Sequence, residues 1–321
     1  MAEAAGPLIA GFDAGQTHTT CRLASLLPDR SWQALGEGTG SGVSHLAADG
    51  GQARFVAALR SSLEAALTQA GLAKDAALAG AGIGASGIEA GSPVQQEGIN
   101  LASQCLGLPA TQVVVLGDEG TALAGAFKGG AGILVISGTG CIALGSDEQG
   151  RTHRCGGWGW LLDGAGSAMD IGRDGLALSV QMADGRLPET ALRQDLWLAL
   201  AARSAQEVKA AVVAPGFGAA GFARLAPCVD QLAMGGDPHA QAVIQRSGEA
   251  LALMVQTIAE QLQLPQPTVC GVGGALRHLD SLQNSFRTAL ERRLPGMRLQ
   301  EPAGDACSGA LSLAAQAALR C

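Results

Sequence analysis

Two short glycine-rich loops, each placed between two predicted β-strands, constrain the fold of this chain more than any other feature. The first has the sequence DAGQTHT and covers residues 13–19, and the second, SGTG, covers residues 137–140. Glycine lets a backbone approach a ligand closely, and successive N–H groups with nearby hydroxyls can face phosphate oxygens. Either loop alone could be an ordinary hairpin turn. Because the unit of strand, glycine turn and strand occurs twice, the sequence predicts two similarly built domains.

Predicted strands and helices alternate along the chain, which is typical of an α/β fold. Strands are predicted at residues 8–13, 19–26, 32–36, 78–83, 113–116, 133–137, 141–145, 152–155 and 268–272. Helices are predicted at residues 51–70, 97–105, 120–127 and 308–320, and from residue 238 to a point before Pro265. The first three strands are expected to form an antiparallel meander. The pattern restarts near residue 118, where we expect the domain boundary.

Length and composition exclude several classes of protein. The 321 residues exceed the roughly 250–300 that one hydrophobic core usually serves, and 47% hydrophobic residues exclude a disordered chain. A net charge of −7 and only 3% aromatic residues disfavour a nucleic-acid partner. No apolar run approaches the length of about 18 residues that a membrane span needs. The eight cysteines lack metal-site spacing, so we expect reduced thiols in a cytoplasmic protein.

Further candidate residues lie where predicted strands end. Asp118 follows the strand 113–116, a place where catalytic groups of α/β folds often lie, although a helix N-cap is the simpler alternative. The glycine-rich segments CGGWGW at 155–160 and CGVGGA at 270–275 could approach a sugar ring and an adenosine, or could be packed turns. A formal G-x-G-x-x-G match at 82–87 lacks the strong strand and the acidic residue of a dinucleotide site.

Together these segments resemble the ATPase family that combines actin, Hsp70 and sugar kinases. Within it, the chain is similar to the BadF/BadG/BcrA/BcrD-type ATPases, in the branch of N-acetylglucosamine kinases and glucosamine kinases. The matching segments, in family order, are GFDAGQTHT, GDEGTALAGAF, VISGTGCIALG, CGGWG followed by GSAMDIGRDGL, and CGVGGAL. The resemblance implies two RNase H-like domains around a nucleotide cleft, here residues 1–117 and 118–304, with a C-terminal helix at about 305–321 that packs on the first.

The resemblance also implies roles for particular residues. Asp118 is the expected catalytic carboxylate, and Asp13 and Asp118 are expected at the site of Mg²⁺. The residues expected to bind ATP are Asp13, Gly15, Gln16, Thr17, Ser137, Gly138, Thr139, Gly140, Gly271, Gly273 and Gly274. The residues expected to bind the sugar are Gly156, Gly157 and Asp163. Asp163 is displaced by one position from the family's acid, and residues 41–43 lack the asparagine that contacts the sugar in amino-sugar kinases.

The expected function is transfer of the γ-phosphoryl group of Mg-ATP to a hydroxyl, the 6-OH, of N-acetylglucosamine or glucosamine. Two alternatives stay open at this point: an ATPase that activates a partner redox enzyme, and a non-catalytic sugar-sensing module. The sequence predicts a small-molecule sugar as the partner, with no nucleic acid and no membrane. It leaves open whether the chain forms a homodimer.

Overall fold

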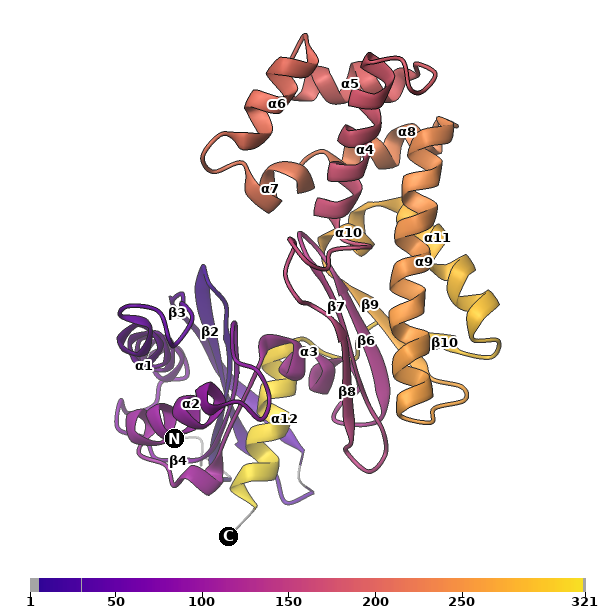
Figure 1. Cartoon of the computed structure of the whole chain (residues 1–321). Helices are drawn as coiled ribbons and strands as arrows, with labels where there is room; N and C mark the ends of the chain where they lie inside the picture. Colours follow the sequence, from indigo (N-terminus) through magenta and orange to yellow (C-terminus); the bar gives the residue numbers. More distant parts are fainter. Residues whose placement is uncertain (1–5, 30, 320–321) are drawn as a thin grey trace. The chain divides into compact units, whose positions relative to one another are not determined.

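The computed structural model describes residues 6–29 and 31–319 of the chain (Figure 1). The chain divides into two compact units, residues 1–130 with 302–321 and residues 131–301. Each unit contains one five-stranded sheet. The division falls after Gly130, whereas the sequence predicted a boundary between residues 117 and 118. The helix that begins at Asp118 stays with the first unit because it packs on the C-terminal helix of that unit.

The first unit is built on a mixed sheet with the strand order β3-β2-β1-β4-β5. Its strands are β1 (Leu8–Ala14), β2 (His18–Leu26), β3 (Trp32–Ser41), β4 (Leu78–Ala85) and β5 (Val113–Leu116). Strands β1, β2 and β3 pair antiparallel, as predicted, and β4 and β5 run parallel to β1. The carboxyl ends of β1, β4 and β5 therefore lie at one edge of this sheet, which is where ligands bind in folds of this class.

Helices of the first unit are α1 (Gly51–Gln69), α2 (Pro93–Leu106), α3 (Asp118–Ala126) and α12 (Ala306–Ala318), with a short 3-10 turn η1 (Ala110–Gln112). Helix α2 begins before the predicted residue 97, because the Ser92 side chain accepts a hydrogen bond from Gln95 N and Pro93 occupies the first turn. Helix α1 packs on β3 and β2, and α12 packs on β1 and β4. The C-terminal helix thus belongs to the first unit, in agreement with the expectation from the family resemblance.

Glycines let α12 lie directly on the sheet. A Cβ atom at Gly11, Gly80 or Gly82 would lie within 2.1–2.7 Å of a carbonyl oxygen of α12. Any side chain on these strand positions would push the helix away from the sheet. The glycines of the G-x-G-x-x-G match therefore include positions with a packing role.

The second unit repeats the connectivity of the first. Its strands are β6 (Gly132–Ser137), β7 (Cys141–Ser146), β8 (Thr152–Gly156), β9 (Thr268–Val272) and β10 (Arg298–Leu299), in the order β10-β9-β6-β7-β8. Strands β6, β7 and β8 pair antiparallel, and β9 and β10 run parallel to β6. In both units, therefore, three strands form an antiparallel meander. Two further strands, parallel to the first strand of the meander, add to the sheet on that strand's free side. The predicted fold of two RNase H-like domains is confirmed.

Most of the second unit is helical. Its helices are α4 (Ala168–Ala183), α5 (Ala191–Ala199), α6 (Ala205–Val213), α7 (Gly218–Ala223), α8 (Ala226–Met234), α9 (Pro238–Gln261), α10 (Gly274–His278) and α11 (Asp280–Arg293). Helix α9 starts where predicted, since the Asp237 side chain accepts hydrogen bonds from the backbone N–H groups of His239 and Ala240. It buries an apolar face, including Leu251 and Val255, in the core of this unit.

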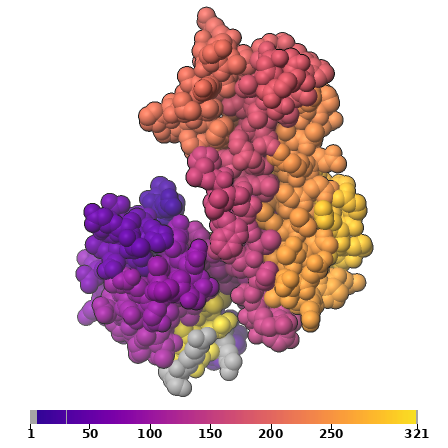
Figure 2. All heavy atoms as spheres, viewed as in Figure 1, coloured from indigo at the N-terminus to yellow at the C-terminus, as the bar shows by residue number. Residues whose placement is uncertain are grey.

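Helices α5, α6 and α7 form a lobe of the second unit that Figure 2 shows as a protrusion in salmon and red. Among the described residues, no helix has the length and apolar character needed to cross a membrane.

Candidate functional site

The first glycine-rich loop connects β1 to β2 and is held by backbone hydrogen bonds from three directions. Gly15 N donates to His18 O at 3.1 Å and closes the turn. Val43 N donates to Gly15 O at 2.9 Å, and Ser86 N donates to Ala14 O at 3.1 Å. The loop is therefore fixed by its neighbours before any ligand binds, which lowers the cost of ordering it around one.

The tip of this loop is open to solvent. Gln16 and Thr17, both expected to bind the nucleotide, are exposed. A Cβ at Gly42 would lie 2.1 Å from Gln16 O, so only glycine lets the segment after β3 lie against the loop. The segment 41–43, in which the amino-sugar kinases have a sugar-contacting asparagine, thus lies directly beside the first loop.

Asp13 lies at the carboxyl end of β1, at the start of the loop, and is half-buried. Its pKa is raised, first by burial and then by the negative charges of Asp118 and Asp305, while His18 acts in the opposite direction. A bound cation would offset these neighbouring negative charges, which oppose the ionisation of Asp13. The effect of Asp118 on the pKa of Asp13 indicates that the two carboxylates lie near each other. That they hold a metal stays a prediction.

Asp118 follows the carboxyl end of β5 and is the first residue of α3, after the N-cap residue Gly117. The alternative of a simple N-cap is therefore wrong. One carboxylate oxygen, Oδ1, accepts a hydrogen bond from Glu119 N at 3.0 Å. A Cβ at Gly84 of β4 would lie 2.0 Å from Thr121 Oγ1, so α3 packs tightly on the sheet. This packing fixes the start of α3 and with it the position of the Asp118 side chain.

Asp305, which precedes α12, is a third carboxylate near this site and was not among the predicted residues. Arg22 of β2 donates two hydrogen bonds to it, Nη1 to Oδ1 and Nη2 to Oδ2, each at 2.8 Å. These bonds hold the pKa of Asp305 well below its usual range. The carboxylate also caps α12 by accepting from Ser308 N. An aspartate three residues before a serine at a helix start is an N-cap signal that could have indicated it.

The thiols nearest the predicted sites are not reactive. Burial, with smaller contributions from nearby carboxylates, raises the pKa of Cys141 and Cys307 to about 12. They are therefore protonated at neutral pH and poor nucleophiles or metal ligands. All seven cysteines in the described part of the chain are free, in agreement with the predicted reduced thiols.

Within residues 6–29 and 31–319, no group of three or more His, Cys, Asp or Glu side chains is arranged to hold a metal ion. The acidic pair of Asp13 and Asp118 nevertheless fits Mg²⁺, which is commonly bound by one or two carboxylates together with waters and substrate phosphates. The Mg²⁺ site remains a prediction.

The second glycine-rich loop connects β6 to β7 and rests on the start of α4. Ser137 is fully buried, and its hydroxyl donates to Gly166 O at 2.7 Å. This hydroxyl is therefore used inside the protein, whereas the sequence predicted that it faces phosphate. Gly138 N donates to Gly140 O at 2.8 Å, and Ala168 N donates to Gly138 O at 2.9 Å. One backbone hydrogen bond thus closes the loop within itself, and the other fixes it to the first residue of α4.

The exposed part of the second loop continues into the glycines after β9. Thr139 and Gly140 are exposed, and a Cβ at Gly140 would meet no atom within 4 Å. Gly273 has a positive φ of 97°, and a Cβ there would lie 2.3 Å from Ser137 O. A Cβ at Gly138 would lie 3.9 Å from Gly274 N. The two predicted nucleotide segments of this unit therefore form one surface without side chains, which suits a ligand that contacts backbone.

A cavity of about 310 Å³ lies next to this surface. Its walls combine apolar, amide and charged side chains with one predicted residue, Gly271; they are Gly271, Leu276, Gln283, Phe286, Arg287, Leu299, Gln300 and Glu301. Apolar and polar groups contribute to these walls in similar measure, and pockets for small ligands use such polar groups to fix the orientation of the ligand. Leu276 ends the predicted segment CGVGGAL. The other six residues escaped prediction because they come from α11 and the segment around β10, which carry no glycine motif.

The predicted sugar-binding residues also meet. Gly156 and Gly157 have positive φ values of 77° and 76°, and a Cβ at Gly156 would lie 3.5 Å from Asp163 Oδ2. Arg154 supports this turn by donating from Nη2 to Gly157 O at 2.7 Å. Its guanidinium lies 4.8 Å from the ring centroid of Trp158, which is 61% exposed. A carboxylate, a glycine backbone and an exposed indole therefore lie together on the surface of the second unit.

Comparisons with known proteins agree with this arrangement. The model of the BadF/BadG/BcrA/BcrD ATPase family matches residues 10–314 of the chain. The N-acetylmuramic acid/N-acetylglucosamine kinase of Clostridium acetobutylicum is 28% identical over 205 residues, which are 63% of this chain and 67% of that protein. The N-acetyl-D-glucosamine kinase of Dictyostelium discoideum is 28% identical over 188 residues, 57% of this chain and 59% of that protein.

A solved structure extends the similarity over nearly the whole chain. The crystal structure of a proposed N-acetylglucosamine kinase from Chromobacterium violaceum is 29% identical and superimposes with a TM-score of 0.71. The match covers 96% of this chain and 99% of that one.

Proposed function

Because the chain belongs to the BadF/BadG/BcrA/BcrD ATPase family, we propose that it is an ATP-dependent carbohydrate kinase. It transfers the γ-phosphoryl group of Mg-ATP to a hydroxyl, the 6-OH, of an amino sugar, N-acetylglucosamine or glucosamine. The observation that carries this proposal is the pair of carboxylates, Asp13 and Asp118, at the carboxyl ends of β1 and β5 beside an exposed glycine loop. The curated relatives are kinases of N-acetylglucosamine, which supports the choice of sugar.

Asp118 acts on the sugar hydroxyl. Its carboxylate orients the hydroxyl for attack and accepts the proton as the new O–P bond forms. A carboxylate is a weak base towards an alcohol, so we place proton transfer late, when the oxygen is already bonding to phosphorus. Phosphoryl transfer of this kind depends mainly on positioning and on stabilisation of charge. The fixed start of α3 supplies the positioning.

Asp13 has its role at the proposed Mg²⁺ site. Asp13 and Asp118 are the residues that would hold Mg²⁺. When bound, Mg²⁺ neutralises the charge of the transferred phosphoryl group. The raised pKa of Asp13 has the sign expected for a carboxylate that awaits a cation, because burial and two like charges oppose its ionisation.

The remaining predicted residues serve the two ligands. The exposed backbone of the first loop, at Gly15, Gln16 and Thr17, binds the phosphates of ATP. Gly138, Thr139 and Gly140 bind phosphate, and Ser137 acts through its position rather than its hydroxyl. The cavity beside Gly271, Gly273 and Gly274 takes the adenosine. Gly156, Gly157 and Asp163 contact the sugar, where Asp163 accepts hydrogen bonds from hydroxyls.

A coupled ADP-release assay with a panel of sugars tests the proposal. We expect ADP release that depends on N-acetylglucosamine or glucosamine, with N-acetylmuramic acid, glucose and N-acetylmannosamine as comparison acceptors. Asp163→Asn should raise KM for the sugar more than it lowers kcat, since this residue is assigned to sugar binding. ADP release that no sugar stimulates would contradict the kinase and support the ATPase activator instead. A cytoplasmic location and a homodimer remain predictions.

A further inference from the structure

A cavity of about 670 Å³ in the first unit has no role in the proposed reaction. It lies between the end of α3, one face of α12 and the start of β3, and none of the predicted ATP, Mg²⁺ or sugar residues lines it. Its volume is within the range of about 300–1,000 Å³ typical of small-molecule sites. A cavity of this size is therefore a candidate site for a small ligand.

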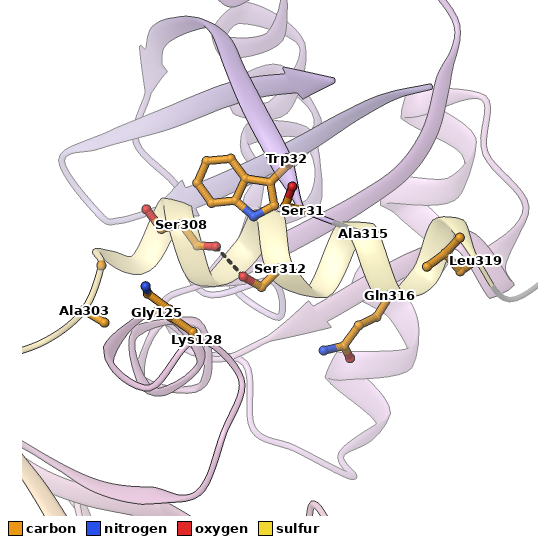
Figure 3. Close-up of a pocket in the computed structure, with 11 residues that line it drawn as sticks. Ser31, Trp32, Gly125, Lys128, Ala303, Ser308, Ser312, Ala315, Gln316 and Leu319 are labelled. Atoms are coloured by element: carbon orange, nitrogen blue, oxygen red, sulfur yellow. Dashed lines mark hydrogen bonds between the residues drawn. The ribbon is translucent and has the colours of Figure 1, made fainter. Parts of the chain in front are cut away.

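The side chains that line the cavity are complementary to a polar, anionic ligand that contains a ring. Lys128 provides an ammonium group, Trp32 an indole, Ser308 and Ser312 hydroxyls, and Gln316 an amide. Figure 3 shows Lys128 and Gly125 at the end of α3, Gln316 extending from α12 towards the same space, and Trp32 near the two serines. Lys128 forms no salt bridge with any described residue. Among the described side chains that line the cavity, Lys128 is the one that carries a charge.

The backbone at Lys128 is a second, independent observation. Lys128 has a positive φ of 51°, in the left-handed region that glycine usually occupies after a helix. The turn is closed by Gly129 N, which donates to Ala124 O at 2.8 Å. Glycine at position 128 would form this turn without strain. A lysine stabilises a helix C-terminus only through its positive charge. A lysine is therefore kept at a left-handed position where glycine would serve, and its side chain lines the cavity.

We propose that this cavity binds a phosphorylated sugar. Lys128 pairs with the phosphate, Trp32 lies against the apolar face of the sugar ring, and the Gln316 amide bonds to sugar hydroxyls. The hydroxyls of Ser308 and Ser312 already donate, to Asp305 Oδ1 and to Ser308 O, so they accept from sugar hydroxyls. Gln316 is within reach of the lysine turn, because a Cβ at Gly129 would lie 3.6 Å from Gln316 Nε2. Binding at this cavity does not depend on the proposed kinase activity, although its ligand belongs to the class of the proposed product.

The position of the cavity connects it to the carboxylates of the candidate active site. Helix α3 begins at Asp118 and reaches the cavity at Gly125. Helix α12 begins after Asp305 and packs on α3 without side chains between them: a Cβ at Gly309 would lie 2.0 Å from Thr121 O, and one at Gly125 2.1 Å from Asp305 O. Such close packing transmits displacement. A ligand in the cavity therefore contacts both helices whose first residues surround Asp13, and its binding should alter turnover.

Calorimetric titration of the full-length protein with N-acetylglucosamine 6-phosphate tests the proposal, with saturating N-acetylglucosamine present to occupy the proposed sugar site. Lys128→Asn removes the charge but keeps a residue that tolerates the left-handed backbone. We expect it to raise Kd about tenfold or more. The matched control, Lys74→Asn, changes an exposed lysine of the same unit that lies outside the cavity, and should bind like the wild type. Equal affinity of the Lys128 variant and the wild type would overturn the proposal.

Two further measurements keep the outcome clear. Ser312→Phe fills the cavity from α12 and should abolish the Lys128-dependent binding; the thermal midpoint of both variants shows whether the fold is kept. Inorganic phosphate, titrated under the same conditions, should bind much more weakly than the sugar phosphate, and inorganic phosphate that binds as tightly would overturn the assignment of a sugar.

Asp118→Asn should retain the Lys128-dependent binding even though it removes turnover. Binding that disappears in Asp118→Asn but not in Lys128→Asn belongs to the active site and refutes the cavity. Conversely, Lys128-dependent binding in a protein that phosphorylates no sugar would leave this inference standing while the proposed function fails.

Discussion

The two glycine-rich loops occupy equivalent places in the two units, between the first two strands of each sheet, yet their chemistry differs. The first begins with Asp13, whose pKa is raised by burial and by neighbouring carboxylates. The second begins with Ser137, a neutral residue whose hydroxyl is consumed by Gly166 O. One loop therefore offers concentrated negative charge beside its amides, and the other offers backbone alone.

In the proposed kinase, this difference indicates different roles for the two loops. The charged loop suits Mg²⁺ and the reacting phosphoryl group, because a cation relieves the repulsion between its carboxylates. The neutral loop suits phosphate oxygens that need hydrogen bonds without further negative charge nearby. The same topology therefore carries two functions, and the predictions below separate them.

The largest effect is expected at Asp118. Asp118→Asn keeps the size of the side chain but removes the group that accepts the proton, and general-base catalysis of this kind is worth roughly 10²–10⁴ in rate. We expect kcat to fall by about that factor while the KM for ATP changes little. The coupled ADP assay measures both, and near-normal turnover would remove Asp118 from its assigned role.

Asp13→Asn should lower activity by roughly 10² or more, since charge that stabilises the transition state is lost, and should at the same time stabilise the protein. A carboxyl with a raised pKa in the folded state binds its proton more tightly there than in the unfolded chain. Its ionisation therefore destabilises the fold above the unfolded pKa, and this cost disappears as the pH falls below about 4. In urea unfolding, the variant should have a higher free energy of unfolding than the wild type at pH 7 and the same free energy of unfolding at low pH.

Asp305→Asn is a control for which the opposite change in stability at pH 7 is expected. The pKa of Asp305 is lowered, chiefly by the hydrogen bonds from Arg22. Its ionised form therefore stabilises the fold at neutral pH, and this stability is lost as the pH falls through the folded-state pKa. The variant should be less stable at pH 7 by about 1 kcal/mol, from loss of the helix cap and the partly exposed ion pair. A loss of stability in Asp13→Asn at pH 7 would contradict the assignment of Asp13 as a strained carboxylate.

Gly273→Ala tests the junction that supports the neutral loop. The added Cβ would lie 2.3 Å from Ser137 O, at a positive φ of 97°. We expect a loss of about 1–3 kcal/mol in stability, as for other overpacked sites, and weaker ATP binding because the loop must move. Gly185→Ala has a comparable φ of 79° with no atom within 4 Å of its Cβ, so it isolates backbone strain from the contact. Chemical denaturation and nucleotide titration of both variants give the comparison.

The smallest effect is expected at Ser137. Ser137→Ala removes one buried hydrogen bond to Gly166 O and should cost about 1 kcal/mol of stability. Since the hydroxyl faces the protein interior, KM for ATP should stay within about twofold of the wild-type value, a change of less than about 0.5 kcal/mol. A large rise in KM without a loss of stability would restore the sequence-based expectation that this hydroxyl contacts phosphate.

Local signals in the sequence were sufficient for most strands, for the two loops and for helix α9, whose start is fixed by Asp237, but not for the short strand β10. They failed where a glycine serves packing rather than a turn. Strand β3 continues to Ser41 through a segment that reads as a loop. A Cβ at Gly38 would lie 2.2 Å from Ala66 N of α1, so these glycines admit a helix that lies on the strand. Sequence alone does not reveal which helix covers which strand.

Contacts between distant residues account for the rest of what was missed at the site. Arg22 and Asp305 are 283 positions apart, so nothing in the local sequence connects them. Phe286 and Arg287 reach the candidate nucleoside cavity from α11, where periodicity reveals only a buried face. The buried hydroxyl of Ser137 was missed for the opposite reason, because its sequence context is that of an exposed phosphate loop.

The most direct test of the central claim is phosphorus NMR of a reaction that contains the full-length protein, ATP, Mg²⁺ and N-acetylglucosamine. The account predicts that one sugar 6-phosphate appears for each ADP formed, and that neither signal grows with Asp118→Asn over the same period. Formation of ADP and inorganic phosphate without any sugar phosphate, at a rate that N-acetylglucosamine does not change, would contradict it.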